Sequence, residues 1–129
     1  MRALLALVVL SSCARAPLLP VRFEQPPVRT TALSARDGQV HLTLEVPPMR
    51  GAASAIEYEL WDAERCLQAG VEPVQQALSE RAPTTLRVGI PWTGAGLASI
   101  RGDLVVRHNG SDERRPFGGR LDPDDAGTR

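Results

Sequence analysis

Hydrophobic and polar residues alternate along most of the chain with a period of two, which is the period of a β-strand and not of a helix. The pattern is clearest in residues 39–46. The aliphatic side chains of this segment are Val40, Leu42, Leu44 and Val46, and the polar ones are Gln39, His41, Thr43 and Glu45. Successive side chains of a strand point to opposite faces, so the segment predicts a strand with one apolar and one solvated face.

Further segments with the same alternation predict more short strands. Asp37-Gly38 is a turn signal, so residues 28–35 are expected to form an antiparallel strand before the first one. The inward side chains of the later strands are Ile56, Tyr58 and Leu60, then Leu86, Val88 and Ile90, then Ile100, Gly102, Leu104 and Val106. Pro91 is expected at the end of its strand, because it has no amide proton to donate.

The pair Asn109-Gly110 is the strongest short hairpin signal in the sequence. It should return the chain through residues 113–118 with Phe117 inward. About seven short strands, spaced near ten residues apart, predict an all-β fold, an antiparallel β-sandwich of about 100 residues.

The segment after Trp61 has a less regular pattern. Residues 62–64 are expected to turn the chain into a strand at 65–69, which Gly70 would end. In residues 71–80 the apolar side chains have helical spacing. They are Val74, Ala77 and Leu78. A lone short helix is marginal in water, so a helix, a strand and a loop all stay open for this segment.

The beginning of the chain resembles the signal sequence of a bacterial lipoprotein. Arg2 provides a positive charge, residues 3–10 an apolar run, and small residues then lead to a cysteine. The lipobox of this resemblance is Leu10, Ser11, Ser12 and Cys13. It implies that residues 1–12 are a signal peptide that is removed, and that the Cys13 thiol receives a diacylglyceryl group. Two acyl chains would hold the protein stably on a membrane.

The apolar run before Cys13 has two other interpretations, a membrane-spanning helix and an ordinary secretory signal. A membrane-spanning helix needs roughly 20 apolar residues, and the run before Cys13 is far shorter. An ordinary secretory signal with a chance cysteine stays open. Ala14 follows the cysteine in place of the aspartate that often retains lipoproteins in the inner membrane. The expected location is therefore the outer membrane, on its periplasmic side.

Composition divides the mature chain into three parts. Residues 13–27 hold four prolines among few polar residues and predict an extended tether. Residues 28–121 carry the alternating segments and predict the folded domain. Residues 122–129 have no apolar residue besides one alanine. They therefore predict a disordered tail that has no side chain to bury in the core.

Charge and cysteine content exclude some classes of function. Fifteen basic residues, all arginine, balance fifteen acidic ones, so the chain has no net positive charge that would favour binding to nucleic acid. With Cys13 acylated, Cys66 is the remaining thiol and has no internal disulfide partner. Cys66 is expected to be a small buried hydrophobe, with redox or metal chemistry as the alternative.

Residues suited to catalysis or metal binding are sparse. His41 and His108 are expected on solvated surfaces, without the nucleophile, base and orienting group of a catalytic triad. No closely spaced Cys and His residues suggest a zinc site. The acidic residues near the end lack the glycine and glutamate of a calcium loop. The sequence therefore predicts a protein that is not an enzyme and carries no cofactor.

Two tryptophans are candidates for contact with a partner. Trp61 falls on the face of its strand opposite Ile56, Tyr58 and Leu60, and an outward tryptophan often anchors a partner. Trp92 follows the strand that ends at Pro91. Core packing at a sheet edge is the favoured interpretation for both, and contact with a partner is the alternative.

Several segments together resemble a known family. They are an alternating strand that runs into a proline pair (42–48), a short strand (56–60), a turn and arm ending in glycine (62–70), a strand between two prolines (82–91) and parts of a closing hairpin (102–106 and 117–119). From residue 39 to 121 the chain resembles the late embryogenesis abundant type 2 family, also called the WHy domain, in particular its bacterial lipoprotein members. Pro47 stands where that family usually has asparagine.

The resemblance implies an Ig-like or fibronectin-like β-sandwich with a non-enzymatic role in desiccation or other envelope stress. The alternative is an accessory lipoprotein that binds a partner in an envelope assembly or secretion complex, or inhibits an envelope enzyme. A dedicated partner predicts a contiguous exposed apolar patch of more than a few hundred Å², including Trp61 or Trp92. A general protectant predicts a polar surface.

Overall fold

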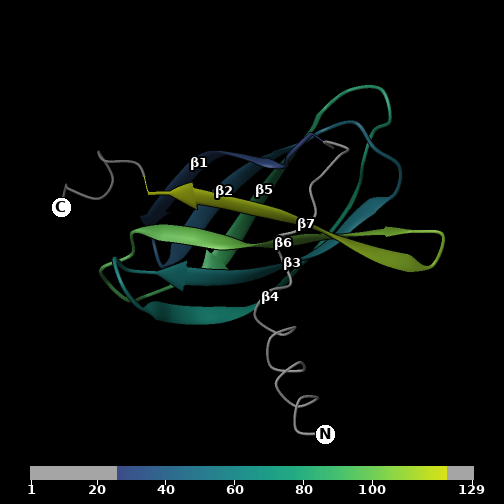
Figure 1. Cartoon of the computed structure of the whole chain (residues 1–129). Helices are drawn as coiled ribbons and strands as arrows, with labels where there is room; N and C mark the ends of the chain where they lie inside the picture. The colour runs from purple at the N-terminus through teal and green to yellow at the C-terminus, as the bar shows by residue number, and fades with distance from the viewer. Residues whose placement is uncertain (1–25, 122–129) are drawn as a thin grey trace, which may run out of the picture.

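Seven β-strands in two antiparallel sheets make up the computed structural model of this protein, which describes residues 26–121 (Figure 1). The strands are β1 (Arg29–Arg36), β2 (Gln39–Val46), β3 (Ala52–Trp61), β4 (Cys66–Ala77), β5 (Thr84–Pro91), β6 (Ser99–His108) and β7 (Ser111–Arg120). One sheet has the order β1-β2-β5 and the other β4-β3-β6-β7. The prediction of an all-β sandwich of about seven strands is confirmed. Within residues 26–121, no helix is long and apolar enough to cross a membrane.

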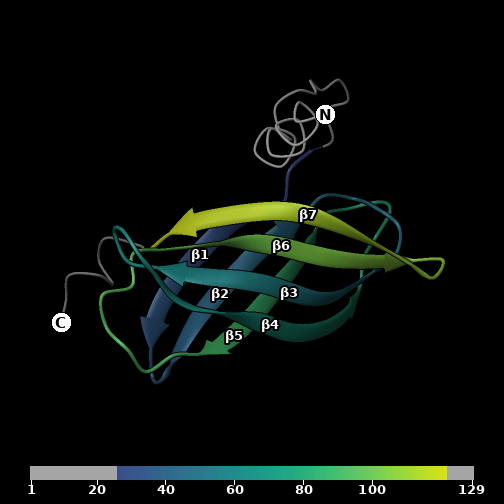
Figure 2. The ribbon, with the colours of Figure 1, turned by 60° about the horizontal axis from the view of Figure 1, so that its bottom comes forward.

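The position of β4 defines the topology. In constant-type immunoglobulin domains the fourth strand belongs to the sheet of the first two strands. Here β4 pairs with β3 instead, which makes the second sheet four strands wide (Figure 2). This is a fibronectin-like arrangement, and it leaves β4 as the edge strand next to β5.

The core lies between the two sheets and is formed by the inward side chains of the alternating segments. Val40, Leu44, Ile56 and Leu60 are completely buried, as their alternation predicts. The remaining predicted inward residues on β5, β6 and β7 belong to the same buried cluster, except Gly102, which has no side chain to bury. The hydrophobic alternation therefore predicted which faces of β2, β3, β5 and β6 pack inward.

Both two-residue hairpin turns have the backbone that their sequences predict. Asp37 and Gly38 have φ of 55° and 75°, and Asn109 and Gly110 have φ of 54° and 79°. A type I′ turn requires positive φ at both central residues, which aspartate, asparagine and glycine tolerate best. These turns therefore set the register of β1 against β2 and of β6 against β7.

The expectation that Gly70 ends a strand is wrong, since β4 continues through Gly70 to Ala77. A side chain on Gly70 would lie 2.9 Å from the hydroxyl oxygen of Tyr58, so the glycine makes room for a core ring. The helical spacing further along has another cause. A β-bulge opposite Ala53–Ala55 shifts the register, with Gln75 at a φ of 60°. Val74 and Leu78 both pack partly buried against the core, on either side of this shift.

Cys66 is exposed, so the expectation of a small buried hydrophobe is wrong. Its cross-strand partner is Trp61, which points outward. Cross-strand partners share a face of the sheet, so Cys66 also faces solvent at the start of an edge strand. The lipobox, residues 1–25 of the signal and tether, and the tail at 122–129 lie outside the described residues.

Candidate binding groove

A groove of about 740 Å³ crosses the outer face of the four-stranded sheet. It is lined by residues 69–71 of β4, 57–59 of β3, 101–103 of β6, and Pro116 and Phe117 of β7. All four strands therefore contribute, and the groove runs across them.

The floor of the groove is a row of residues in register. Gly70, Tyr58, Gly102 and Phe117 lie opposite one another on the four strands. Tyr58 and Phe117 point into the core, where they are 8% and 7% exposed. All four residues occupy inward-facing positions of their strands, so backbone forms the outer surface of this row. A side chain at Gly102 would overlap the backbone oxygen of Glu57, so β6 approaches β3 this closely because Gly102 is a glycine.

The two walls are the outward side chains of the neighbouring rows. One wall holds Ala69, Glu59 and Arg101 in register, and the other holds Val71, Glu57, Asp103 and Pro116. Val71 is 62% exposed and is the one large hydrophobic side chain that is exposed among the described residues. The groove therefore combines an apolar end at β4 with charged groups at its centre.

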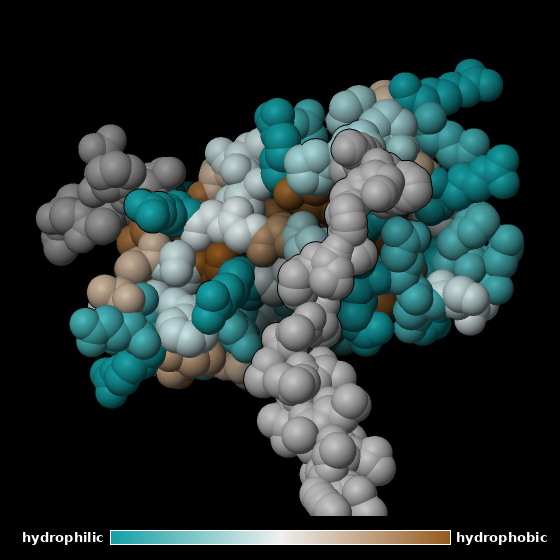
Figure 3. All heavy atoms as spheres, viewed as in Figure 1, coloured by the Kyte–Doolittle hydropathy of each residue, from teal (hydrophilic) through white to brown (hydrophobic). Residues whose placement is uncertain are grey.

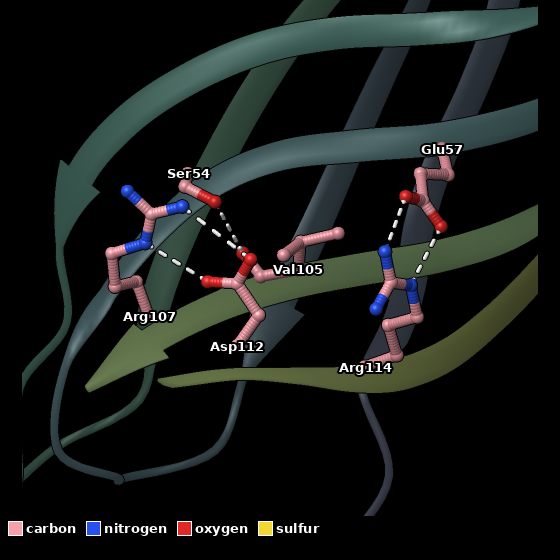
Figure 4. A network of polar contacts seen from close by, with 6 residues as sticks. All are labelled: Ser54, Glu57, Val105, Arg107, Asp112 and Arg114. Atoms are coloured by element: carbon pink, nitrogen blue, oxygen red, sulfur yellow. Dashed lines mark hydrogen bonds and ion pairs between the residues drawn. The ribbon is translucent and has the colours of Figure 1, made fainter. Parts of the chain in front are cut away.

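Glu57 is held by a bidentate ion pair that reaches across β6. Nε and Nη2 of Arg114 donate hydrogen bonds of 2.9 Å and 2.8 Å to its two carboxylate oxygens (Figure 4). These bonds lower the pKa of the Glu57 carboxyl and raise that of the Arg114 guanidinium. Figure 4 places Val105 between this pair and the Arg107–Asp112 pair. Val105 is 5% exposed, because the stems of long charged side chains cover apolar surface.

Trp61 takes part in a second cluster beside the groove. Its Nε1 donates a 3.0 Å hydrogen bond to Oε1 of Glu59, and Nε of Arg101 donates to the same oxygen at 3.3 Å. The guanidinium carbon of Arg101 lies 4.0 Å from the centroid of the Trp61 ring, which is a cation–π geometry. Trp61 thus lies on the outer face, as its alternation predicts, and it orients a groove residue.

Asp103 is the exception among the charged groove residues. Within residues 26–121, this half-buried carboxylate makes no ion pair and no side-chain hydrogen bond. Its cross-strand partner on β3 is Glu57, which carries the same charge. The nearest positive charge that acts on Asp103 is that of Arg114, whose pKa it helps to raise. Arg114 is already paired with Glu57, so Asp103 has no ion-pair partner of its own in the described part of the chain.

The other residues singled out from the sequence lie elsewhere. Trp92 follows β5 and packs partly buried against the core, with its backbone nitrogen donating to the Gly38 oxygen. His41 is on the outer face of the three-stranded sheet and His108 at the end of β6. Neither is fully solvated, since both are half-buried.

In the described part of the chain, no three His, Cys, Asp or Glu side chains are grouped to hold a metal ion.

Comparison of the chain with protein-family models, with curated proteins and with solved structures finds no match. Sequence reasoning missed Asp103 and Val71 as groove residues. The signal that could have found them is Gly102, a glycine at an inward position of an otherwise aliphatic strand.

Proposed function

We propose that this protein is a lipid-anchored envelope lipoprotein whose β-sandwich binds a partner without catalysing a reaction. Two features support the proposal. The lipobox Leu10-Ser11-Ser12-Cys13 supports the anchor. The groove on the four-stranded sheet supports binding, and the observation that carries it is an unpaired carboxylate, Asp103, in the same concave site as an exposed apolar side chain, Val71.

The chemistry of the groove favours an extended protein segment with apolar side chains and one basic side chain. Binding sites combine apolar surface with a few placed polar groups that orient the ligand. An arginine or lysine of the partner would satisfy Asp103, and an adjacent apolar side chain would cover Val71. The anchor at Cys13 would keep the domain close to partners in the same membrane.

The anchor is tested by growing cells with a labelled fatty acid and isolating the protein. The wild-type chain should carry the label, and Cys13→Ser should carry none and keep residues 1–12. The chain contains two cysteines, so Cys66→Ser is the matched control and should be labelled like the wild type. Label on Cys13→Ser would overturn the anchor.

The groove is tested with a photo-crosslinking residue at position 71 in intact cells. Position 85 is the control, because Thr85 is also exposed and lies on the outer face of the other sheet. We expect a discrete, saturable crosslink from position 71, which Asp103→Asn weakens, and none from position 85. Equal crosslinking from both positions would contradict a role for the groove.

A second candidate is protection of the envelope under desiccation or other stress, as the family resemblance implies. The division of hydrophobic surface into small patches on one face of the molecule favours it. On the face shown in Figure 3, outside the area that grey residues cover, brown residues are divided by hydrophilic ones. Survival of drying separates the two candidates: a general protectant should tolerate Val71→Asp, and a partner-binding module should lose its function.

A further inference from the structure

The outer face of the three-stranded sheet carries a second concave site. This hollow of about 500 Å³ lies over β1, β2 and β5. Its outward side chains form three cross-strand rows, which are Arg36 with Gln39, then Ser34 with His41 and Gly89, then Ala32 with Thr43 and Arg87. The rows place the two arginines at opposite corners and His41 in the middle.

The charge of the hollow has one sign. Arg36 and Arg87 line it, and none of its lining residues is acidic. Within residues 26–121, neither arginine forms an ion pair. Glu45, the nearest outward carboxylate along β2, is bound by Arg29 at 3.0 Å. Asp37, next to Arg36 in the turn, forms no ion pair with it. The two guanidiniums are thus available to an anion from outside.

The centre of the hollow contains an unsatisfied polar atom. Nε2 of His41 is buried and has no hydrogen-bond partner among the described residues, which is uncommon because a buried polar atom without a partner is costly. Gly89 beside it has no side chain and leaves space. That space is covered by the amide of Gln39, whose Oε1 would lie 2.9 Å from a side chain at Gly89. The Gln39 side chain is exposed and can rotate.

We propose that this hollow binds a phosphate group, either free or as part of a lipid headgroup. Arg36 and Arg87 provide the charge, since guanidiniums match phosphate oxygens with paired N–H donors. The Gln39 amide, the Ser34 hydroxyl and the His41 ring offer further hydrogen bonds. The proposal is independent of the groove and of the anchor at Cys13.

The test uses the full chain with Cys13→Ser, so that no lipid is attached, and inorganic phosphate as the probe. NMR should show saturable shifts of the His41 ring and of the Gly89 amide. Arg36→Gln combined with Arg87→Gln should weaken the affinity about tenfold or more, since tenfold corresponds to 1.4 kcal/mol and charge-assisted hydrogen bonds are worth at least that.

The matched control is Arg81→Gln combined with Arg120→Gln. These arginines are also exposed, make no ion pair within residues 26–121 and lie outside the hollow. The control removes the same two positive charges as the test variant. It should leave the affinity for phosphate within about twofold of that of the starting chain, which is much less than the tenfold loss expected from the test variant. Equal loss in both double variants, or no saturable shift with phosphate, would overturn the site.

Vesicles distinguish the two sources of phosphate. Sedimentation with phosphatidylglycerol vesicles and with neutral phosphatidylcholine vesicles compares the two double variants. Extra binding to the anionic vesicles that Arg36→Gln with Arg87→Gln abolishes, and the control keeps, supports a lipid headgroup. Phosphate shifts without such vesicle binding support a soluble phosphate ligand.

Discussion

The outer faces of the two sheets show how differently one alternating pattern can present charge. On the four-stranded sheet, Glu57 is paired with Arg114 and Glu59 with Arg101. On the three-stranded sheet, Arg36 and Arg87 have no acidic partner among residues 26–121. Each face consists of the outward positions of its strands, but register decides which charges meet. Exposed ion pairs add little to stability, so the difference bears mainly on which ligands each face attracts.

The two faces also differ in what their glycines do. Gly102 lies so close to β3 that a side chain would meet backbone, whereas a side chain at Gly89 would meet the mobile end of Gln39. A side chain at position 102 in the floor of the groove would therefore require the backbone to shift. The floor of the hollow is adaptable.

The largest expected effect comes from Gly102→Ala, which would force β6 away from β3. Overpacking typically costs 1–3 kcal/mol and more where backbone must move. We expect the free energy of unfolding to fall by about 3 kcal/mol, and the Tm by more than about 10 °C, in thermal and urea unfolding. Gly118→Ala is the control, because its nearest neighbour would be 3.6 Å away. A loss below about 1 kcal/mol for Gly102→Ala would mean that the close approach is not required.

A smaller effect is expected from Arg101→Ala, which removes the cation–π contact with Trp61 and the bond to Glu59. Such exposed contacts contribute about 0.5–1 kcal/mol each, so urea unfolding should show a loss of about 1 kcal/mol. The fluorescence of Trp61, measured with Trp92→Phe, should also change. Arg87→Ala on the other face is the comparison and should change stability by less than about 0.5 kcal/mol. Equal losses in both variants would remove the distinction between the faces.

Gly89→Ala should be close to neutral. Alanine in a strand is favoured over glycine by about 0.5–1 kcal/mol, and displacement of the Gln39 amide offsets part of this gain. The free energy of unfolding should therefore stay within about 0.5 kcal/mol of the wild type. The added methyl group narrows the space beside His41, so phosphate shifts of His41 should weaken although no charge has changed. Unweakened shifts would place the phosphate elsewhere.

The smallest effect concerns acid stability. Hydrogen bonds from arginine lower the pKa of Glu57 and of Asp112 in the folded protein. A lowered pKa stabilises the fold above the ordinary values of 4.5 and 3.8, and this contribution is lost as the pH falls through the lowered pKa. Arg114→Gln should return the pKa of Glu57 toward its ordinary value, measured by NMR titration, and reduce the loss of stability below that pH. Arg36→Gln, which removes an arginine without a carboxylate partner, should leave that titration unchanged.

The sequence predicted the inward faces of β2, β3, β5 and β6 because alternation is a local property. It also located both hairpins, since Asp37-Gly38 and Asn109-Gly110 carry their turn geometry with them. It failed at Gly70 and Cys66, where the outcome depends on a residue across the strand. Gly70 accommodates Tyr58, and Cys66 shares its face with Trp61.

In the candidate sites, too, some features follow from neighbours in sequence and others from residues on different strands. Trp61 could be placed on an outer face from its neighbours in sequence, but its contact with Arg101 joins residues on different strands. Asp103 has no local feature that marks it as unpaired. Its isolation results from register, which places Glu57 opposite it.

The sequence by itself determined that this chain forms short strands with one apolar face, and where two pairs of these strands are joined by tight turns. The tertiary structure alone decided that β4 joins β3, that glycines of separate strands align into a groove, and that two arginines face a hollow without an acid. The physical reason is that propensity and alternation act between neighbours in sequence. Charge pairing and surface shape depend instead on residues that only sheet register brings together.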